Sequence, residues 1–145
     1  MPVPNASDSP GGAAVPAVAP EIQVLVLDTL GELVRFFPAG WAVFVGGTVA
    51  PLGGHNVLEP ATYGKPVAFG PHTENVAGAA AALCAAGGGT VVRTPAQLAE
   101  HWDGLLAHRG AAESAGARAR GAAAAQAEAL DDTWELLAPL LRGHG

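Results

Sequence analysis

The sequence predicts an α/β fold, a Rossmann-like parallel sheet with helices on both faces. Short apolar runs of strand length alternate along the chain with segments that carry helix caps and helical spacing, which is the pattern of βα units. The apolar runs are continuous rather than alternating, as expected of strands that are covered on both sides. A length of 145 residues is enough for a single core but not for two full domains.

The beginning of the chain is expected to lie outside this fold. Residues 1–20 are rich in Pro, Ala and Gly and lack apolar periodicity, so they are predicted to form a disordered leader to a domain of residues 21–145. The first strand is expected over residues 22–27, IQVLVL. Thr29 and Glu32 then stand in the spacing of a capping box and predict a helix start.

The second and third predicted strands enclose the most polar part of the chain. Residues 41–45 form a continuous apolar run that predicts the second strand, and residues 66–69 predict the third. Between them, Asn56 is a suitable N-cap for a helix that runs to about Tyr63.

Caps and glycines predict the remaining elements. Thr73 is expected to cap a long Ala-rich helix that ends at residues 87–89, and residues 90–92 predict a fourth, short strand. Thr94, followed at once by Pro and three residues on by Gln, predicts another helix start. Residues 111–141 are expected to form a long helical region.

Ligands of parallel α/β sheets bind outside the carboxyl ends of the strands. Here polar or Gly-rich loops follow those ends at residues 28–29, 46–48 and 70–73. Glycines let backbone N–H groups approach a phosphate, and a helix N-terminus adds partial positive charge, so residues 53–56 form a candidate phosphate site. The alternative is that the Gly-Gly pairs are plain turns, since the pattern is neither a P-loop nor a dinucleotide fingerprint.

Two carboxylates and two histidines accompany these loops. Glu32 and Glu59 each stand three residues after a cap, so each either closes a capping box or accepts hydrogen bonds from a ribose diol. His55 and His72 lie on loops that are expected to converge, where they are candidates to donate to a phosphate or a sugar carboxylate. The alternative for both is a solvated turn histidine.

Composition excludes several functional classes. The formal net charge is −6 and Lys65 is the only lysine, which argues against nucleic-acid binding. Cys84 stands alone and is expected to be a small buried residue, and no group of side chains shows metal-ligand spacing. No apolar run approaches the roughly 18 residues of a membrane span. Because no evident catalytic couple is present, the pattern leaves catalytic residues unknown and supports binding of a nucleotide or sugar phosphate.

Five motifs resemble one family when taken in order: DTLGEL at residues 28–33, FVGGT at 44–48, GGHNVLEP at 53–60, GKPV at 64–67 and GPHTEN at 70–75. Together they resemble the carboxyl-terminal half of the 3-deoxy-D-manno-octulosonic acid (Kdo) transferases. These are inverting, metal-independent glycosyltransferases of the two-Rossmann-domain GT-B architecture. They move Kdo from CMP-Kdo to the lipid A precursor, lipid IVA, in lipopolysaccharide biosynthesis. The resemblance therefore implies CMP-Kdo as donor substrate and no cofactor.

The resemblance also implies two sets of site residues. The cytidine-nucleotide set, in which Glu59 is the ribose ligand, is Leu30, Gly31, Glu32, Asn56, Val57, Leu58 and Glu59. Leu30 stands where the family usually has Met, and Val57 stands where it often has Pro. The set that resembles the family's site near the donor phosphate and sugar is Thr48, Gly53, Gly54, His55, His72, Thr73 and Asn75.

One departure from the family bears on activity. Family members carry an amino-terminal domain with the acceptor site and the catalytic carboxylate base, and no counterpart precedes Ile22 in this sequence. The chain is therefore expected to be a soluble, cytoplasmic donor-binding half, inactive alone, of an enzyme at the cytoplasmic side of the inner membrane. Its membrane contact is expected to be peripheral if any. The alternatives are a non-catalytic nucleotide-binding module or remnant, and a GT-B transferase that uses another nucleotide sugar.

Overall fold

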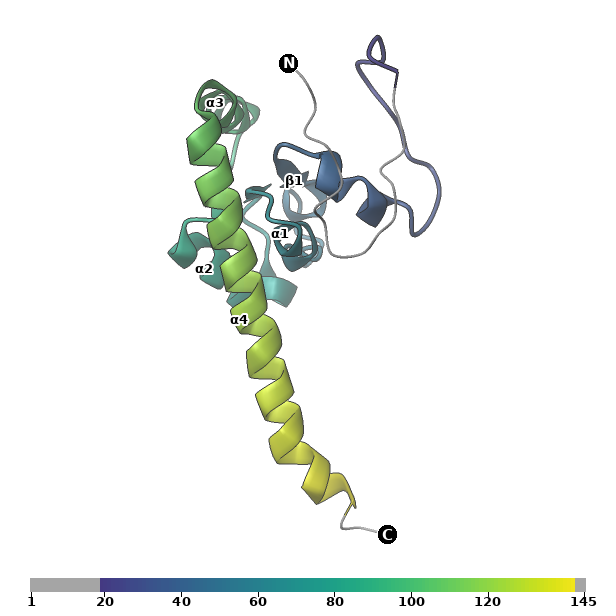
Figure 1. Cartoon of the computed structure of the whole chain (residues 1–145), viewed down its shortest axis with the longest axis vertical. Helices are drawn as coiled ribbons and strands as arrows, with labels where there is room; N and C mark the ends of the chain where they lie inside the picture. The colour runs from purple at the N-terminus through teal and green to yellow at the C-terminus, as the bar shows by residue number, and fades with distance from the viewer. Residues whose placement is uncertain (1–18, 143–145) are drawn as a thin grey trace.

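A parallel sheet forms the centre of the molecule, which confirms the predicted α/β class (Figure 1). The computed structural model describes residues 19–142. The sheet has the order β1-β2-β3, with both neighbouring pairs parallel. Its three short strands are β1 (Val43–Val45), β2 (Val67–Phe69) and β3 (Gly89–Val91). Because crossovers between parallel strands are right-handed, this sequential order carries both crossover connections over the same face.

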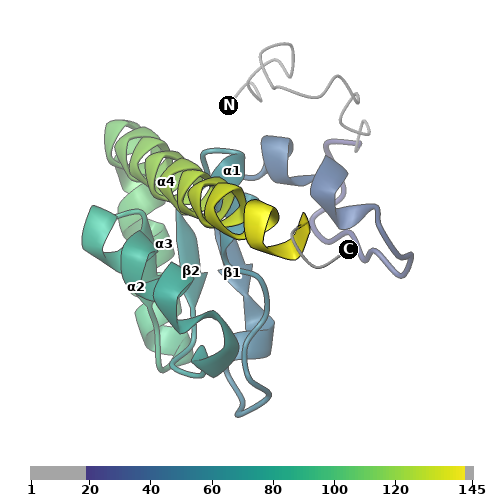
Figure 2. The ribbon, with the colours of Figure 1, turned by 90° about the horizontal axis from the view of Figure 1, so that it is seen from below.

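Helices cover both faces of the sheet, as predicted. On one face the long final helix α4 lies across α1 and α2, with the strands behind them (Figure 2). On the other face, Phe44 of β1 and Leu98 of α3 line a common cavity, and the Trp41 indole N–H donates to the Leu105 carbonyl of α3 at 3.3 Å. The helices are α1 (Leu58–Thr62), α2 (Ala77–Ala86), α3 (Pro95–Ala107) and α4 (Arg109–Arg142).

The core lies between the sheet and the layer of α1, α2 and α4. Val67 and Phe69 of β2 are fully buried there, together with Leu83 of α2. Small residues let α4 come close: a Cβ added to Gly116 would lie 2.0 Å from the carbonyl oxygen of Gly64. Only a Gly at this position permits that approach of α4 to the turn after α1.

Local signals placed most helix ends correctly. The Asn56 side chain accepts from the backbone N–H groups of Leu58 and Glu59, and the Thr94 hydroxyl accepts from Gln97 N–H at 3.2 Å. The α2 helix ends at Gly87, whose φ of 74° is left-handed. The β3 strand begins one residue earlier than expected, at Gly89.

Five expectations were wrong or lie outside the described residues. Residues 22–27 form irregular, mostly exposed backbone instead of a strand, because no strand pairs with them. The helix expected after Thr29 is reduced to two 3-10 turns, Leu33–Arg35 and Phe37–Ala39. Thr73 makes no cap, since a 3-10 turn at Glu74–Val76 precedes α2, and Cys84 is exposed. Of the predicted leader, residues 1–18 lie outside the described residues.

Candidate functional site

The loops after β1 and β2 are joined by one buried threonine. The Thr48 hydroxyl donates to the Val45 carbonyl at 2.5 Å and accepts from Gly70 N–H at 2.6 Å. The Thr48 carbonyl in turn accepts from His72 N–H at 3.0 Å. Thr48 is fully buried, and its expected contact with a ligand stays a prediction. Its hydrogen bonds instead hold the two carboxyl-end loops together.

A second link joins the Gly53-Gly54 turn to the loop after β2. Asn75 N–H donates to the Gly53 carbonyl at 2.8 Å. Both glycines have φ near +88° (Gly53 88°, Gly54 87°), a region that other residues rarely adopt. A Cβ on Gly54 would lie 2.9 Å from the His72 carbonyl oxygen. The glycines are therefore required here by backbone shape and by close approach, which favours the turn interpretation over direct phosphate contact.

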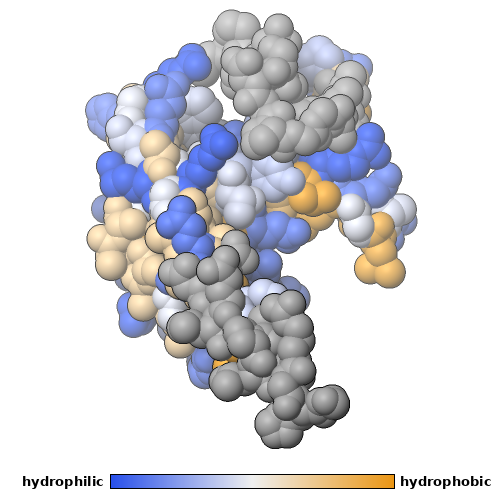
Figure 3. Space-filling view, turned by 60° about the horizontal axis from the view of Figure 1, so that its bottom comes forward, coloured by the Kyte–Doolittle hydropathy of each residue, from blue (hydrophilic) through white to orange (hydrophobic). Residues whose placement is uncertain are grey.

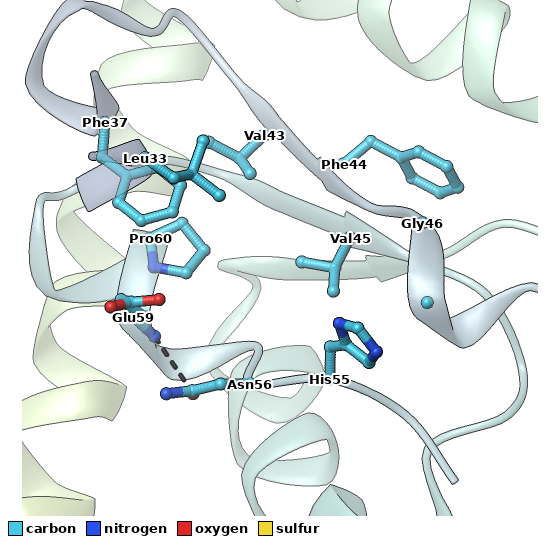
Figure 4. Close-up of a pocket in the computed structure, with 11 residues that line it drawn as sticks. Leu33, Phe37, Val43, Phe44, Val45, Gly46, His55, Asn56, Glu59 and Pro60 are labelled. Atoms are coloured by element: carbon cyan, nitrogen blue, oxygen red, sulfur yellow. Dashed lines mark hydrogen bonds between the residues drawn. The ribbon is translucent and has the colours of Figure 1, made fainter. Parts of the chain in front are cut away.

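A cavity of about 310 Å³ opens beside the carboxyl end of β1 (Figure 4). His55, Asn56 and Glu59 line it together with Gly46 and Gly47, and Figure 4 shows His55 near Gly46 with Glu59 farther away, beside Pro60. An apolar wall completes the cavity and consists of Leu33, Phe37, Val43, Phe44, Val45 and Pro60. The cavity thus combines a flat apolar surface with a carboxylate, an amide and an imidazole.

The two polar residues at the start of α1, Asn56 before the helix and Glu59 in its first turn, have different roles. Asn56 Oδ1 accepts from Leu58 N–H at 3.0 Å and from Glu59 N–H at 3.3 Å, so the free N–H groups of this helix start are already bound. The Glu59 carboxylate makes no hydrogen bond within the described part of the chain, and the side chain is exposed. Glu59 therefore does not close a capping box, and its carboxylate is available to a ligand.

The two histidines do not meet in one cavity. The His55 ring lies against Gly47, where an added Cβ would be 2.5 Å from the ring. His72 faces away, toward a second cavity of about 500 Å³, and its Nδ1 lies 3.4 Å from a Glu74 carboxylate oxygen. The pKa of the Glu74 carboxyl is lowered mainly by a hydrogen bond from the Glu74 backbone N–H, and to a smaller extent by His72.

The second cavity lies on the α3 face of the sheet and is largely apolar. Its walls include Phe44, Val92 and Leu98, and Arg93 and His72 are its charged or titratable members. It shares only Phe44 with the first cavity. The carboxyl edge of the sheet therefore carries a polar cavity on one face and an apolar cavity on the other.

Several predicted nucleotide residues do not reach the first cavity. Leu30, Gly31 and Glu32 are exposed and do not line it, and Glu32 instead accepts from the Thr29 hydroxyl. The Val57 side chain is fully buried in the core, and Leu58 packs partly against the same core. Of this set only Asn56 and Glu59 present side chains to the cavity, and their role with a nucleotide stays a prediction.

The apolar wall was missed by sequence reasoning. Leu33 and Phe37 come from the 3-10 turns before β1, and Pro60 comes from α1. The spacing of Leu33 and Phe37, one helical turn apart, is the one signal that indicates a common apolar face. Nothing local indicates that this face meets Pro60, because that contact joins segments distant in sequence.

Residues 19–142 contain neither a metal-binding cluster nor a helix that could span a membrane. No cluster of three or more His, Cys, Asp or Glu side chains is arranged to hold a metal ion within these residues. None of the helices in that range combines the length and apolar character needed to cross a bilayer.

Known proteins resemble the chain in both sequence and structure. A 3-deoxy-D-manno-octulosonic acid transferase of Bordetella pertussis is 40% identical over 120 residues, which are 81% of this chain and 28% of that protein. The corresponding enzyme of Chlamydia pneumoniae is 32% identical over 117 residues, 80% of this chain and 27% of the relative. The chain thus spans less than a third of the length of these relatives. No family model matches it.

A solved structure has the same fold. The crystal structure of the C-terminal CMP-Kdo binding domain of WaaA from Acinetobacter baumannii superposes with a TM-score of 0.62 at 29% sequence identity. The match covers 66% of this chain and 50% of that one.

Proposed function

We propose, from the relation of this chain to the carboxyl-terminal part of the Kdo transferases, that it binds the sugar nucleotide CMP-Kdo. One observation carries the proposal: Glu59 and Asn56 meet Gly46 and Gly47 in one cavity at the carboxyl end of β1. This is where parallel α/β sheets bind nucleotides. The similar solved domain, from Acinetobacter baumannii, is described as binding CMP-Kdo.

The cavity offers a group for each part of the nucleotide. The free carboxylate of Glu59 suits the two ribose hydroxyls, since it accepts two hydrogen bonds. The wall of Leu33, Phe37 and Pro60 suits the flat cytosine ring. The imidazole of His55 lies beside Gly47 and suits the phosphate. The Asn56 amide nitrogen is a further donor, because only its oxygen is used by the α1 cap.

The proposed reaction is the transfer of Kdo to lipid IVA, the lipid A precursor, in lipopolysaccharide synthesis at the cytoplasmic face of the inner membrane. An acceptor hydroxyl gives its proton to a base, and its oxygen forms a bond to the anomeric carbon of Kdo. The bond from that carbon to the phosphate oxygen breaks, and CMP leaves with the electron pair. The chain's residues would bind and orient the donor and neutralise the leaving phosphate without a metal ion.

The base belongs to another part of the enzyme under this proposal. Glu59 is the only carboxylate that lines the cavity among the described residues, and it is assigned to the ribose. The chain in isolation should therefore bind the donor without transferring its sugar. Turnover of CMP-Kdo with lipid IVA by the purified chain alone would contradict this part of the proposal.

Calorimetric titration with CMP, CDP and UDP tests the donor. CMP should bind saturably, with the same affinity in EDTA, and UDP should not bind. Glu59→Ala should weaken CMP binding at least about tenfold, a loss of about 1.4 kcal/mol. The melting temperature should not change, because the carboxylate makes no bond in the fold. Glu100→Ala, which removes an exposed carboxylate of α3, is the matched control and should bind normally.

The other outcomes of the titration distinguish the alternative functions. A preference for UDP would replace the CMP-Kdo proposal by a transferase with another donor. Normal CMP affinity in Glu59→Ala would remove the carboxylate from the site. Saturable CMP binding by a chain that shows no turnover even when mixed with the amino-terminal part of the Bordetella pertussis relative would favour a non-catalytic nucleotide-binding module.

A further inference from the structure

The second cavity, of about 500 Å³, has no part in the proposed donor site. It is large enough for a ligand, since ligand pockets in proteins usually occupy about 300–1,000 Å³. Phe44 lines both cavities, and Figure 4 shows its ring turned away from Val45 and His55. Because successive side chains of a strand point to opposite faces, the two cavities lie on opposite sides of one strand end.

The lining of the second cavity is apolar and carries one free positive charge. Its apolar members are Phe44, Val49, Pro71, Val92, Pro95 and Leu98. Arg93 is exposed, and its backbone N–H donates to Gln97 Oε1 at 2.8 Å, while its guanidinium has no partner within residues 19–142. His72 already lies beside the Glu74 carboxylate. Among the described residues of the lining, Arg93 is therefore the one permanent cation that is available to an anionic ligand.

An exposed apolar loop continues this cavity at the carboxyl edge of the sheet. Residues 49–52 read VAPL, and Val49, which lines the cavity, is 57% exposed, while Leu52 is 72% exposed. The loop has a defined shape, since Val49 N–H donates to the Gly46 carbonyl at 3.1 Å. Exposed apolar side chains also lie on the projection at the right of Figure 3, in residues 22–30, but these residues line neither cavity. The loop and the cavity together thus form one apolar surface with a cation beside it.

These features fit an acyl chain with a phosphate better than they fit a sugar. A sugar presents many hydroxyl groups, and hydroxyl groups that are buried without partners cost free energy. Among the described residues the lining offers only three polar side chains, those of His72, Arg93 and Thr94, and the Thr94 hydroxyl already accepts from a backbone N–H of α3. An acyl chain requires apolar contact alone, and an Arg guanidinium matches the geometry of a phosphate.

We propose that the second cavity binds one acyl chain of the lipid acceptor, an acylated sugar phosphate, and that Arg93 pairs with its phosphate. The inference rests on the proposed function, which supplies an acceptor of this class. A donor in the first cavity has its phosphate beside His55 and Gly47, just beyond the end of β1. The acceptor reaches the same strand end from the α3 face, on the other side of Phe44. Its hydroxyl group then meets the donor sugar at the carboxyl edge, while the apolar chain stays out of the donor cavity.

Titration of the isotope-labelled chain with dodecyl phosphate, kept below its critical micelle concentration, tests the site by magnetic resonance. The amides of Val49, Val92 and Arg93 should shift saturably. Inorganic phosphate, which lacks the chain, and dodecyl maltoside, which lacks the charge, should each bind at least about tenfold more weakly. Equal binding of dodecyl maltoside would overturn the role of Arg93.

CMP added to the same sample separates this inference from the proposed function. CMP should shift the amides of His55 and Glu59, which line the first cavity. If these shifts were missing, the proposed function would be contradicted, whatever dodecyl phosphate does. If they were present and dodecyl phosphate caused no shift, the acyl-chain site alone would be overturned.

Two variants with matched controls locate the ligand. Val49→Asp places a negative charge at the mouth of the cavity, and Arg93→Gln removes the guanidinium, so each should bind dodecyl phosphate about tenfold more weakly. Val24→Asp and Arg120→Gln change exposed residues that line neither cavity and should bind it normally. All four variants should melt like the natural chain, because all four side chains are exposed. Equal affinities in the four variants would overturn the inference.

Vesicle flotation distinguishes the acceptor from the bulk membrane as the source of the acyl chain. The chain should float with phosphatidylethanolamine vesicles that contain lipid IVA. It should bind at least about tenfold more weakly when phosphatidylglycerol of equal total charge replaces the lipid IVA. Arg93→Gln should reduce this difference, and Arg120→Gln should leave it unchanged. Equal binding of the natural chain to both kinds of vesicle would assign the cavity to the membrane surface and overturn the proposal.

Discussion

The β1 strand with the loops that follow it (residues 43–76) and the segment that precedes it (residues 20–32) share one sequence pattern but differ in structure. Both consist of an apolar run of strand length followed by a polar, Gly-containing turn. Residues 43–76 are fixed by backbone bonds between strands and by the contacts of Thr48. Residues 20–32 are mostly exposed. The difference teaches that a strand sequence forms a strand only where a partner edge repays its ordering entropy.

Close packing of glycine backbone explains why the first region is fixed. A Cβ added to Gly70 would lie 2.3 Å from the Thr48 carbonyl oxygen and 2.9 Å from Val49 Cα, both backbone atoms. Gly70→Ala should therefore separate the two loops and lower the free energy of unfolding by about 3 kcal/mol, the largest effect predicted here. Urea unfolding followed by circular dichroism measures it.

Gly78→Ala provides the control for that variant. Gly78 lies in α2 and nothing stands within 4 Å of its added Cβ, so Ala should stabilise the fold by about 0.5–1 kcal/mol. If Gly70→Ala unfolded at the same urea concentration as the natural chain, the loops would not be locked and the contrast between the two regions would disappear.

The Thr48 hydroxyl accounts for the next largest effect. Thr48→Val keeps the shape of the side chain but leaves the buried Gly70 N–H without its acceptor, at a cost of about 2 kcal/mol. Thr48→Ser keeps the hydroxyl and loses one methyl group, at a cost of about 0.8 kcal/mol. The same unfolding measurement ranks the two variants. A more stable Val variant would show that packing rather than hydrogen bonding joins the loops.

Short-range signals made much of the fold predictable. Asn56 and Thr94 mark helix starts because a side-chain oxygen reaches N–H groups two or three residues away, a contact set by local sequence. The Ile22–Leu27 strand failed for the opposite reason, since its formation depends on an edge supplied by distant residues. The family resemblance pointed to Glu59, which lines the first cavity, and also to Val57, which the core buries.

The rest of the site depends on contacts between segments that are distant in sequence. No local pattern shows that Leu33 and Pro60 form one wall, or that His72 turns to the opposite face from His55. Capping-box spacing also left two roles open for Glu59, and the structure removes one of them because Asn56 caps the helix alone. Spacing constrains which atoms meet within one turn, whereas a cavity requires contacts between several segments.

Lys65 joins the fixed region to the 3-10 turns that follow the exposed segment. Its ammonium donates to the Pro38 carbonyl, across a sequence distance of 27 residues. Lys65→Met keeps most of the apolar stem and removes the donor, so the two 3-10 turns should lose hydrogen-exchange protection while β2 keeps its own. The free energy of unfolding should fall by only about 1 kcal/mol. Equal loss in β2 would mean that the two regions unfold as one unit.

The pH dependence of Lys65 is the smallest effect and the sharpest test of its burial. Burial lowers the pKa of Lys65 below its ordinary value of 10.5. The unfolded chain then holds this proton to higher pH than the folded chain, so its contribution to stability increases as pH rises through the window just below 10.5. The stability advantage of the natural chain over Lys65→Met should accordingly grow from pH 8 to pH 10. Burial also raises the pKa of the Cys84 thiol, but both chains carry Cys84, so its titration cancels in the difference. If the advantage instead shrank over this range, the charged form of Lys65 would be favoured in the fold. The hydrogen bond that its ammonium donates to Pro38 would then outweigh the cost of burying its charge.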